Sequence, residues 1–204
     1  MYSIGITGGI GAGKTMALTY VKEHYPCEIY IADEVAHKVM EPGQPCYERI
    51  VELMGKGILA KDRTIDKIAM AARIFMDKNL LNRVNAIVHP AVQEYLTQCL
   101  TQGKAKPELA FVFVEAALLI EAGYTDKMDE LWYIHAEEFV RRKRLEAQRG
   151  YSPDRITQVI RQQLTEEAFR KECHVVLENN GTPEELYKQI DQRLEVITWN
   201  SCIH

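Results

Sequence analysis

Short apolar runs recur along the chain, and between them lie longer segments in which apolar residues return every three or four positions. Apolar runs of this length are typical of strands that are buried on both faces of a parallel sheet. Five runs predict strands, at Tyr2–Thr7, Glu28–Ala32, Leu109–Val114, Leu131–His135 and Val175–Leu177. Strands that alternate with helices indicate βαβ units, so the pattern predicts an α/β fold with helices on both faces of a parallel sheet.

Helical spacing is found in the segments around these strands. The predicted helices are Lys14–His24, Pro45–Met54, Ile65–Phe75, Lys78–His89, Pro90–Thr101, Ala136–Arg149, Pro153–Glu172 and Glu184–Ile197. Proline disfavours helix at the residue before it, so we expect a break at His89. Gly150–Ser152 predicts a hinge. Thr182 as N-cap, Pro183 at the first helical position and Glu185 in a capping box predict the start of the last helix.

One connection is much longer than the others, because residues 33–108 separate the second predicted strand from the third. A crossover needs only one helix and short loops. The segment therefore predicts a helical insert beside the carboxyl ends of the strands, where open α/β sheets bind ligands.

The composition excludes several classes of protein and of partner. The chain has 204 residues, 47% hydrophobic and 26% charged, which excludes a disordered or fibrous protein. A formal net charge of -4 gives no global basic field, so we expect no nucleic-acid partner. The five cysteines show no C-x-x-C pair, and neither a signal peptide nor a membrane-spanning run is recognisable. We therefore expect a cytoplasmic protein that has no membrane partner.

The strongest chemical signal is the segment Gly8–Thr15, which matches G-x-x-x-x-G-K-[ST] between a predicted strand and a predicted helix. Its glycines let successive N–H groups converge on a phosphate at the helix N-terminus. Lys14 is expected to reach the β- and γ-phosphates, and the Thr15 hydroxyl to ligate Mg²⁺. The pattern predicts a nucleoside triphosphate site; the alternative is a chance glycine-rich turn.

Two carboxylates follow predicted strands. Asp33 comes after the second strand, where it could accept a proton from an attacking hydroxyl or hold Mg²⁺ through water. The alternative is an N-cap for the following helix. Glu115 ends the third apolar run and could position a metal or water; it could equally be an ordinary acid at a strand–loop junction. Glu121 is a weaker candidate of the same kind.

Basic residues gather around the hinge: Arg141, Arg142, Lys143, Arg144, Arg149, Arg155 and Arg161. Mobile guanidinium groups can neutralise the charge that develops in phosphoryl transfer. Arg144 is the best candidate because Leu145 beside it can fix the helix face, while most of the others are expected to be solvated. His89 could bind an anionic part of a phosphate acceptor; the alternative is a capping or buried structural histidine.

Together these residues resemble the dephospho-CoA kinase family over nearly the whole chain. The matching motifs are Gly5–Thr15, Asp33, Glu41-Pro42-Gly43, Ile87-Val88-His89-Pro90, Leu118-Leu119-Ile120-Glu121 and Asn179-Asn180-Gly181. The resemblance implies a P-loop kinase fold with a five-stranded parallel sheet, a helical acceptor-binding insert and a helical lid. It implies the phosphorylation of the ribose 3′-hydroxyl of dephospho-CoA by ATP, which gives CoA and ADP in the last step of coenzyme A biosynthesis.

The resemblance also implies roles for parts of the chain. Residues 1–33, 108–136 and 173–204 would form the nucleotide-binding core, 34–107 the acceptor-binding insert and 137–172 the lid. Asp33 would be the base, with Lys14 and Arg144 as further catalytic residues, and Asp33, His89 and Glu115 would contact the acceptor. The expected nucleotide contacts are Gly9, Ile10, Gly11, Ala12, Gly13, Lys14, Thr15, Met16, Asn179 and Gly181.

The sequence departs from the family pattern at a few positions. Ile31 stands where the family usually has an acid, Gln148 replaces a second lid arginine, and Cys173-His174 replaces an Ala-Asp pair. Two alternatives stay open: another small-molecule or nucleotide kinase on the same scaffold, and a nucleotide-binding switch with little transferase activity. A switch would hydrolyse nucleotide whether or not an acceptor is present, whereas a kinase should require the acceptor.

Overall fold

The computed structural model describes residues 1–117, 119–120, 123 and 125–202. Its internal contacts divide the chain into two compact units. One consists of Met1–Ile29 together with Lys106–His204, and the other of Tyr30–Ala105. The second unit is thus inserted into the first along the sequence.

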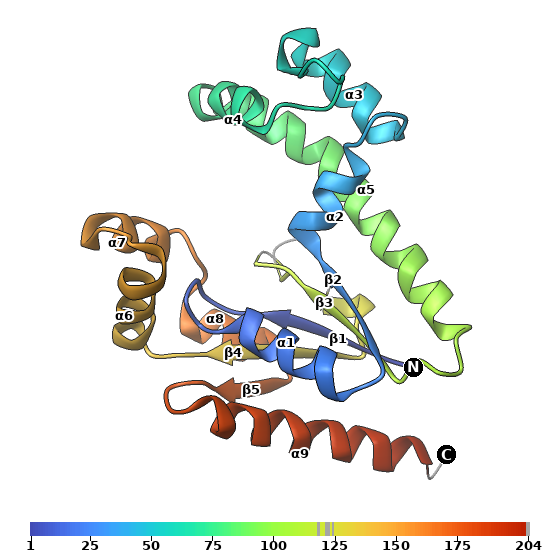
Figure 1. The fold of residues 1–204 in the computed structure, drawn as a ribbon, viewed down its shortest axis with the longest axis vertical. Helices are drawn as coiled ribbons and strands as arrows, with labels where there is room; N and C mark the ends of the chain where they lie inside the picture. Colours follow the sequence, from blue (N-terminus) through green and yellow to red (C-terminus); the bar gives the residue numbers. More distant parts are fainter. Residues whose placement is uncertain (118, 121–122, 124, 203–204) are drawn as a thin grey trace. The chain divides into compact units, whose positions relative to one another are not determined.

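The strands are β1 (Tyr2–Thr7), β2 (Cys27–Ile31), β3 (Phe111–Glu115), β4 (Glu130–His135) and β5 (Val175–Glu178). They form one sheet of order β2-β3-β1-β4-β5 (Figure 1). Strand β1 pairs in parallel with β3 and β4, and β5 pairs in parallel with β4. The five predicted strands are confirmed, with ends that differ by at most two residues, and β1 occupies the centre.

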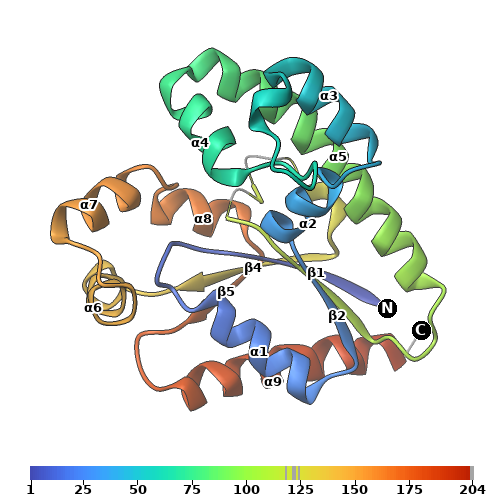
Figure 2. The ribbon, with the colours of Figure 1, turned by 45° about the horizontal axis from the view of Figure 1, so that its top comes forward.

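Both faces of this sheet are buried along the three central strands, β3, β1 and β4. On one face, Ile6 of β1 and Ile134 of β4 pack with the buried sides of α1 (Lys14–His24) and α9 (Pro183–Cys202), the two helices that lie side by side in Figures 1 and 2. Tyr20 stacks on Tyr187 at 4.1 Å between ring centres and ties α1 to α9. On the other face, Tyr133 stacks on Phe169 at 4.7 Å. The sheet is therefore covered on both sides, as the apolar runs predict.

The basic segment after β4 forms three helices, α6 (Glu138–Arg149), α7 (Pro153–Arg161) and α8 (Glu166–Glu172). Gly150, at φ 60°, closes α6 at the predicted hinge, and the Ser152 side chain accepts from Arg155 N to begin α7. The prediction of one helix over Pro153–Glu172 was wrong. The Thr165 side chain accepts a hydrogen bond from Ala168 N and starts a new helix there, a capping interaction that the apolar spacing alone does not reveal.

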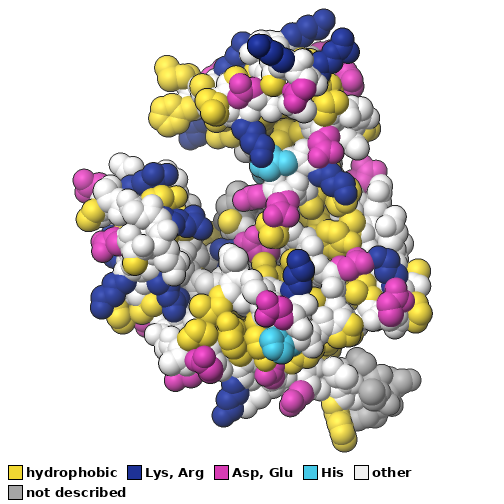
Figure 3. Space-filling view, in the orientation of Figure 1, with side chains coloured by type: hydrophobic (Ala, Val, Ile, Leu, Met, Phe, Trp, Pro, Cys, Tyr) yellow, Lys and Arg dark blue, Asp and Glu magenta, His cyan; other side chains and the backbone are white. Residues whose placement is uncertain are grey.

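The unit Tyr30–Ala105 contains α2 (Ala32–Val39), α3 (Pro45–Met54), α4 (Lys67–Met76) and α5 (Lys78–Lys104), with a short 3₁₀ turn, η1 (Lys56–Ile58). A second turn, η2 (Thr125–Lys127), precedes β4. Helices α2, α3 and α4 all contact the long α5. Helix α4 buries none of its residues, and hydrophobic side chains lie exposed over it in Figure 3.

The predicted break at His89 was wrong, because α5 runs through Pro90 without interruption. Proline inside a helix removes one backbone hydrogen bond and costs about 3 kcal/mol. That cost is offset by a buried stripe on both sides of the proline, which includes Val84, Val88, Val92 and Leu96. His89 is exposed in the middle of the helix, so it is neither a cap nor a buried structural histidine.

Within the described part of the chain, α-helices of sufficient length are too polar to cross a membrane, so no candidate span is found.

Candidate active site

The loop between β1 and α1 is built around Gly13, which adopts φ 101° at the N-terminus of the helix. A Cβ at this position would lie 2.1 Å from Asn179 Nδ2. Both the left-handed backbone and the close approach require glycine here. Ala12 N donates to Gly9 O at 3.1 Å and closes a tight turn within the loop. The glycine pattern thus produces the compact loop that it predicts.

Several carbonyl oxygens of the loop are bound by side chains. Gly8 O accepts a hydrogen bond from Lys14 Nζ at 2.8 Å, and Ala12 O accepts one from Asn179 Nδ2 at 2.6 Å. Gly11 O accepts a longer one from Arg144 Nη1 at 3.4 Å. Carbonyl oxygens repel phosphate, so engaging them with donors makes the loop a better receptor for an anion.

Lys14 and Glu115 meet at the edge where β1 and β3 end. Lys14 Nζ lies 3.6 Å from Glu115 Oε1, and each side chain is 15% exposed. The register pairs Glu115 with Ile6, one residue before β1 ends. Parallel strands bring their carboxyl ends to one edge, which explains why residues 101 positions apart in sequence form this ion pair.

Arg144 and Asn179 form a second group at the loop. Arg144 Nη2 donates to Asn179 O at 3.0 Å, and Asn179 N donates to His135 O at 2.7 Å. The Asn179 side chain is only 1% exposed. Burial lowers the pKa of the Arg144 guanidinium, which nevertheless has a pKa high enough to keep its charge at neutral pH. The structure therefore places a charged guanidinium beside the loop.

Two further residues of the basic segment contact the loop, and the sequence did not distinguish them. Gln163 Oε1 accepts from Ile10 N at 3.1 Å and from Arg141 Nη1 at 3.4 Å. A Cβ on Gly9 would lie 2.1 Å from Arg141 Nη1, so this guanidinium lies directly over the loop. Arg141 Nε is buried and has no hydrogen-bond partner among the described residues. Gln163 carries no sequence signal, since a glutamine between two helices has many ordinary roles.

The remaining predicted nucleotide contacts differ in their surroundings. Thr15 is exposed in the first turn of α1, with its hydroxyl accessible. The Met16 side chain packs against the core, so only its backbone could serve a nucleotide. Gly181 is exposed, and a Cβ there would meet the carboxylate of Glu185. Glu121 lies outside the described residues.

Asp33 and His89 belong to the unit Tyr30–Ala105. Asp33 is exposed in the first turn of α2, whose N-cap is Ile31. The alternative interpretation of Asp33 as an N-cap was therefore wrong. His89 is exposed on α5.

Two of the positions that depart from the family pattern, His174 and Gln148, are described by the structure. His174 Nδ1 accepts a hydrogen bond from Leu131 N at 3.0 Å, and His174 N donates to Leu131 O at 2.9 Å. His174 thereby extends the pairing of β4 with the segment that leads into β5. Gln148 and Arg149 are exposed at the end of α6, one turn beyond Arg144.

A parallel sheet of this order, with a G-K-T loop after its central strand and a guanidinium bonded to that loop, defines a P-loop kinase. The family model of dephospho-CoA kinase matches residues 2–185. The chain belongs to the dephospho-CoA kinase family.

Two relatives are similar over almost their full length. A dephospho-CoA kinase of Geobacter sulfurreducens is 35% identical over 192 residues, which cover 94% of this chain and 96% of the relative. One of Corynebacterium efficiens is 34% identical over 200 residues, with coverage of 97% and 98%.

Solved structures share the fold. A crystal structure of a Thermus thermophilus protein has a TM-score of 0.78 at 29% identity and covers 95% of this chain and 96% of its own. A dephospho-CoA kinase from Campylobacter jejuni has a TM-score of 0.70 at 21% identity, with coverage of 95% and 97%. A shikimate kinase from Acinetobacter baumannii has a TM-score of 0.55 at 16% identity, with coverage of 98% and 94%. The predicted P-loop kinase fold is thus confirmed.

Proposed function

We propose that the protein transfers the γ-phosphoryl group of ATP to the ribose 3′-hydroxyl of dephospho-CoA, which yields CoA and ADP. The observation that carries this proposal is the phosphate loop, with Lys14, Arg144 and Asn179 bonded to its carbonyl oxygens, in a chain of this family. Both proposed substrates, ATP and dephospho-CoA, are small molecules, as is usual for kinases of this family. No observation favours the alternative of a nucleotide switch.

In this proposal, Lys14 and Arg144 supply the positive charge that phosphoryl transfer needs. Charge spreads over the equatorial oxygens of the transferred group, and catalysis is mostly positioning and electrostatic stabilisation. Both cations contact the loop in the structure: Lys14 donates a hydrogen bond to Gly8 O, and Arg144 donates one to Gly11 O. On arrival of the triphosphate, they would exchange carbonyl partners for phosphate oxygens. Asn179 and Gly181 are proposed to lie near the adenine.

The residues present fit a magnesium ion at this site. Mg²⁺ prefers oxygen ligands and is usually held by few protein groups together with water and substrate phosphates. The exposed Thr15 hydroxyl and the Glu115 carboxylate are donors of this kind. Among the described residues there is no cluster of three or more His, Cys, Asp and Glu side chains that could hold a metal ion. When bound, the ion would neutralise charge on the β- and γ-phosphates.

Asp33 is proposed as the base that accepts the proton of the ribose hydroxyl, and His89 and Glu115 as contacts to the acceptor. The exposed position of Asp33 in the first turn of α2 leaves its carboxylate accessible to a substrate. Residues 34–107 are proposed as the acceptor-binding insert and 137–172 as the lid. A cytoplasmic location is proposed because Cys27, Cys46, Cys99 and Cys173 are free thiols, which a reducing compartment preserves.

The test is phosphate transfer from ATP and Mg²⁺ to dephospho-CoA by the purified protein, with the product mass read directly. The acceptor should gain one phosphate, and ATP consumption should depend on the acceptor. In Asp33→Asn, kcat should fall by about 100-fold or more, since general-base catalysis contributes on that order.

Glu34→Gln is the matched control, because Glu34 is exposed in the same turn of α2. It should transfer phosphate at the wild-type rate. ATP hydrolysis without an acceptor and no phosphorylated product would contradict the proposal. Equal activity of wild type and Asp33→Asn would contradict only the role of Asp33.

A further inference from the structure

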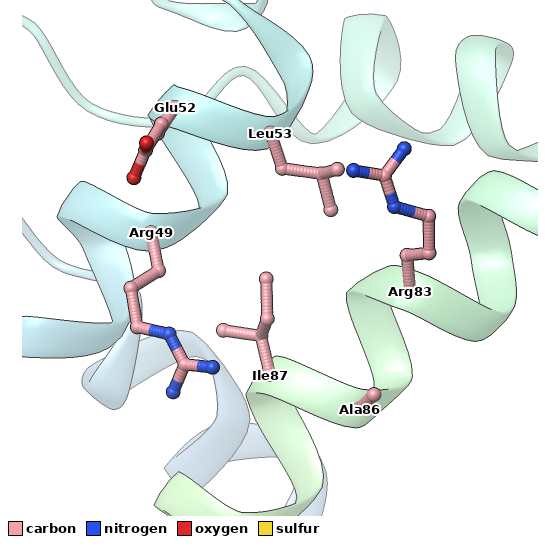
Figure 4. A pocket seen from close by; sticks show the side chains of 6 residues that line it. All are labelled: Arg49, Glu52, Leu53, Arg83, Ala86 and Ile87. Carbon is pink, nitrogen blue, oxygen red and sulfur yellow. The ribbon is translucent and has the colours of Figure 1, made fainter.

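The unit Tyr30–Ala105 contains a surface groove of approximately 480 Å³ between α3 and α5 (Figure 4). It is lined by Arg49, Glu52, Leu53, Arg83, Ala86 and Ile87. Ile87 belongs to the motif Ile87-Val88-His89-Pro90, but the other five residues lie outside the sequence motifs, and none of the six belongs to the phosphate loop. The groove is a separate feature that the site described above does not explain.

The two helices contribute to the groove with the same spacing. Arg49, Glu52 and Leu53 occupy positions i, i+3 and i+4 of α3, and Arg83, Ala86 and Ile87 occupy the same positions of α5. Residues at this spacing share one face of a helix. In Figure 4 the guanidinium groups lie at opposite sides of the groove, with Leu53 and Ile87 between them. The result is an apolar centre with a cation on each side.

The guanidinium groups of Arg49 and Arg83 are available to bind a ligand. Both are exposed, and among the described residues neither forms a hydrogen bond or an ion pair. Lys and Arg side chains gather at the end of this unit that carries α3 and α4 (Figure 3), although the net charge of the chain is -4. A guanidinium fork matches phosphate oxygens, and two forks around an apolar centre fit an anion that carries an aliphatic arm.

We propose that this groove binds the acceptor by its diphosphate and the adjoining pantetheine arm. Arg49 and Arg83 bind the diphosphate oxygens, and Leu53 and Ile87 pack against the aliphatic part of the arm. Glu52, the single acid among the six lining residues, accepts a hydrogen bond from an amide of the arm. The inference rests on the proposed function, since dephospho-CoA is the organic diphosphate that this reaction uses.

A competing explanation is that the arginine stems only cover apolar surface, as long charged side chains often do. The two explanations differ in what the charge does. A covering role predicts lower stability on substitution with no effect on substrate, whereas a binding role predicts weaker acceptor binding at unchanged stability.

The experiment compares Arg49→Gln, Arg83→Gln and the double variant with the wild type, each as the full chain. Each single variant should raise the KM for dephospho-CoA by about 10-fold, as expected for loss of a charged hydrogen bond to phosphate, with kcat and the KM for ATP unchanged. Calorimetry with dephospho-CoA alone should show the same weakening without turnover. Arg49→Lys and Arg83→Lys should recover part of the affinity, because they keep the charge. Lys61→Gln, an exposed cation of the same unit outside the groove, is the control.

The outcomes separate this inference from the proposed function. Normal transfer with an unchanged KM for dephospho-CoA in the double variant would overturn the groove assignment alone. The same conclusion follows if only the melting temperature falls. If the wild type transfers no phosphate but binds dephospho-CoA, and the double variant binds it more weakly, the groove assignment stands and the proposed function fails. A wild type that neither transfers to nor binds dephospho-CoA would overturn both.

Discussion

Gly13 shows how a single residue decides whether the phosphate loop can form. Its φ of 101° costs an L-residue about 1–2 kcal/mol, and a Cβ would also displace Asn179 from Ala12 O. Gly13→Ala should therefore lower the free energy of unfolding by about 2–5 kcal/mol, as the backbone strain adds to the loss of a buried hydrogen bond. It should also abolish ATP binding. Chemical denaturation and calorimetry measure the two effects.

Gly43 supplies the control for this prediction. It has φ 90°, but a Cβ there would meet nothing within 4 Å. Gly43→Ala should lower the free energy of unfolding only by the cost of the backbone strain, and it should leave ATP binding unchanged. Equal losses of stability in the two variants would contradict the steric argument at Gly13.

At the scale of elements, the packing of α5 overrides the tendency of proline to interrupt a helix. Pro90 lies in the interior of this 27-residue helix. Pro90→Ala restores an N–H that can donate to the carbonyl of Ala86, so the free energy of unfolding should rise by about 1–3 kcal/mol. Urea denaturation measures this change. Pro153→Ala is the control, because Pro153 stands at the first position of α7, where proline is favourable, and its removal should bring no gain. A loss of stability in Pro90→Ala would show that the helix accommodates the proline without strain.

The contact of α8 with β4 and β5 should make the stability of the fold depend on pH. The buried His135 ring lies 2.5 Å from Glu178 and 3.4 Å from Glu166, and Arg170 bonds to both carboxylates. Burial raises the pKa of Glu178, but the hydrogen bonds from His135 and Arg170 outweigh it and hold this pKa below its ordinary value of 4.5. The hydrogen bond from Arg170 is the main cause of a lowered pKa at Glu166.

A carboxylate with a lowered folded-state pKa contributes stability above its unfolded pKa and loses it as the pH falls through the folded value. The free energy of unfolding should therefore decline as the pH drops below about 4.5. Glu178→Gln should make this acid decline shallower, whereas Glu146→Gln, an exposed glutamate of α6, should leave it unchanged. Denaturation curves between pH 3 and 7 provide the measurement. An identical acid slope in wild type and Glu178→Gln would contradict the assignment.

The elements also show which parts of this molecule a sequence can predict. The phosphate loop follows from eight consecutive residues, and the strands follow from continuous apolar runs, because both signals are local. The break at His89 was predicted from the proline alone, but it does not occur because the buried stripe of α5 continues beyond it. Asn179 was expected near the nucleotide only through the family resemblance; its bond to Ala12 O joins residues 167 positions apart, which no local pattern encodes. The groove of Arg49 and Arg83 likewise depends on the packing of two helices.

For the whole molecule, the division into two units predicts which helical and loop segments each substrate protects from exchange. Each hydrogen bond to the phosphate loop described above comes from the unit of Met1–Ile29 and Lys106–His204. A non-hydrolysable ATP analogue alone should slow amide hydrogen exchange in residues 8–16, whereas dephospho-CoA alone should slow exchange around 49–53 and 83–87. Mass spectrometry of peptic fragments measures both. Protection of 83–87 by the nucleotide alone would contradict the separation of the two sites.

The central place of β1 has a consequence for how the chain is made. Tyr2–Thr7 is synthesised well before its two neighbours in the sheet, residues 111–115 and 130–135, and before Asn179, which bonds the loop after it. The inserted unit of residues 30–105 is compact and can collapse while synthesis continues. Strand β1 therefore has no partner in the sheet until more than 100 further residues have been synthesised. A ribosome that stalls before residue 111 releases a polypeptide whose apolar central strand lacks both partners, which is a substrate for chaperones rather than a nucleotide-binding protein.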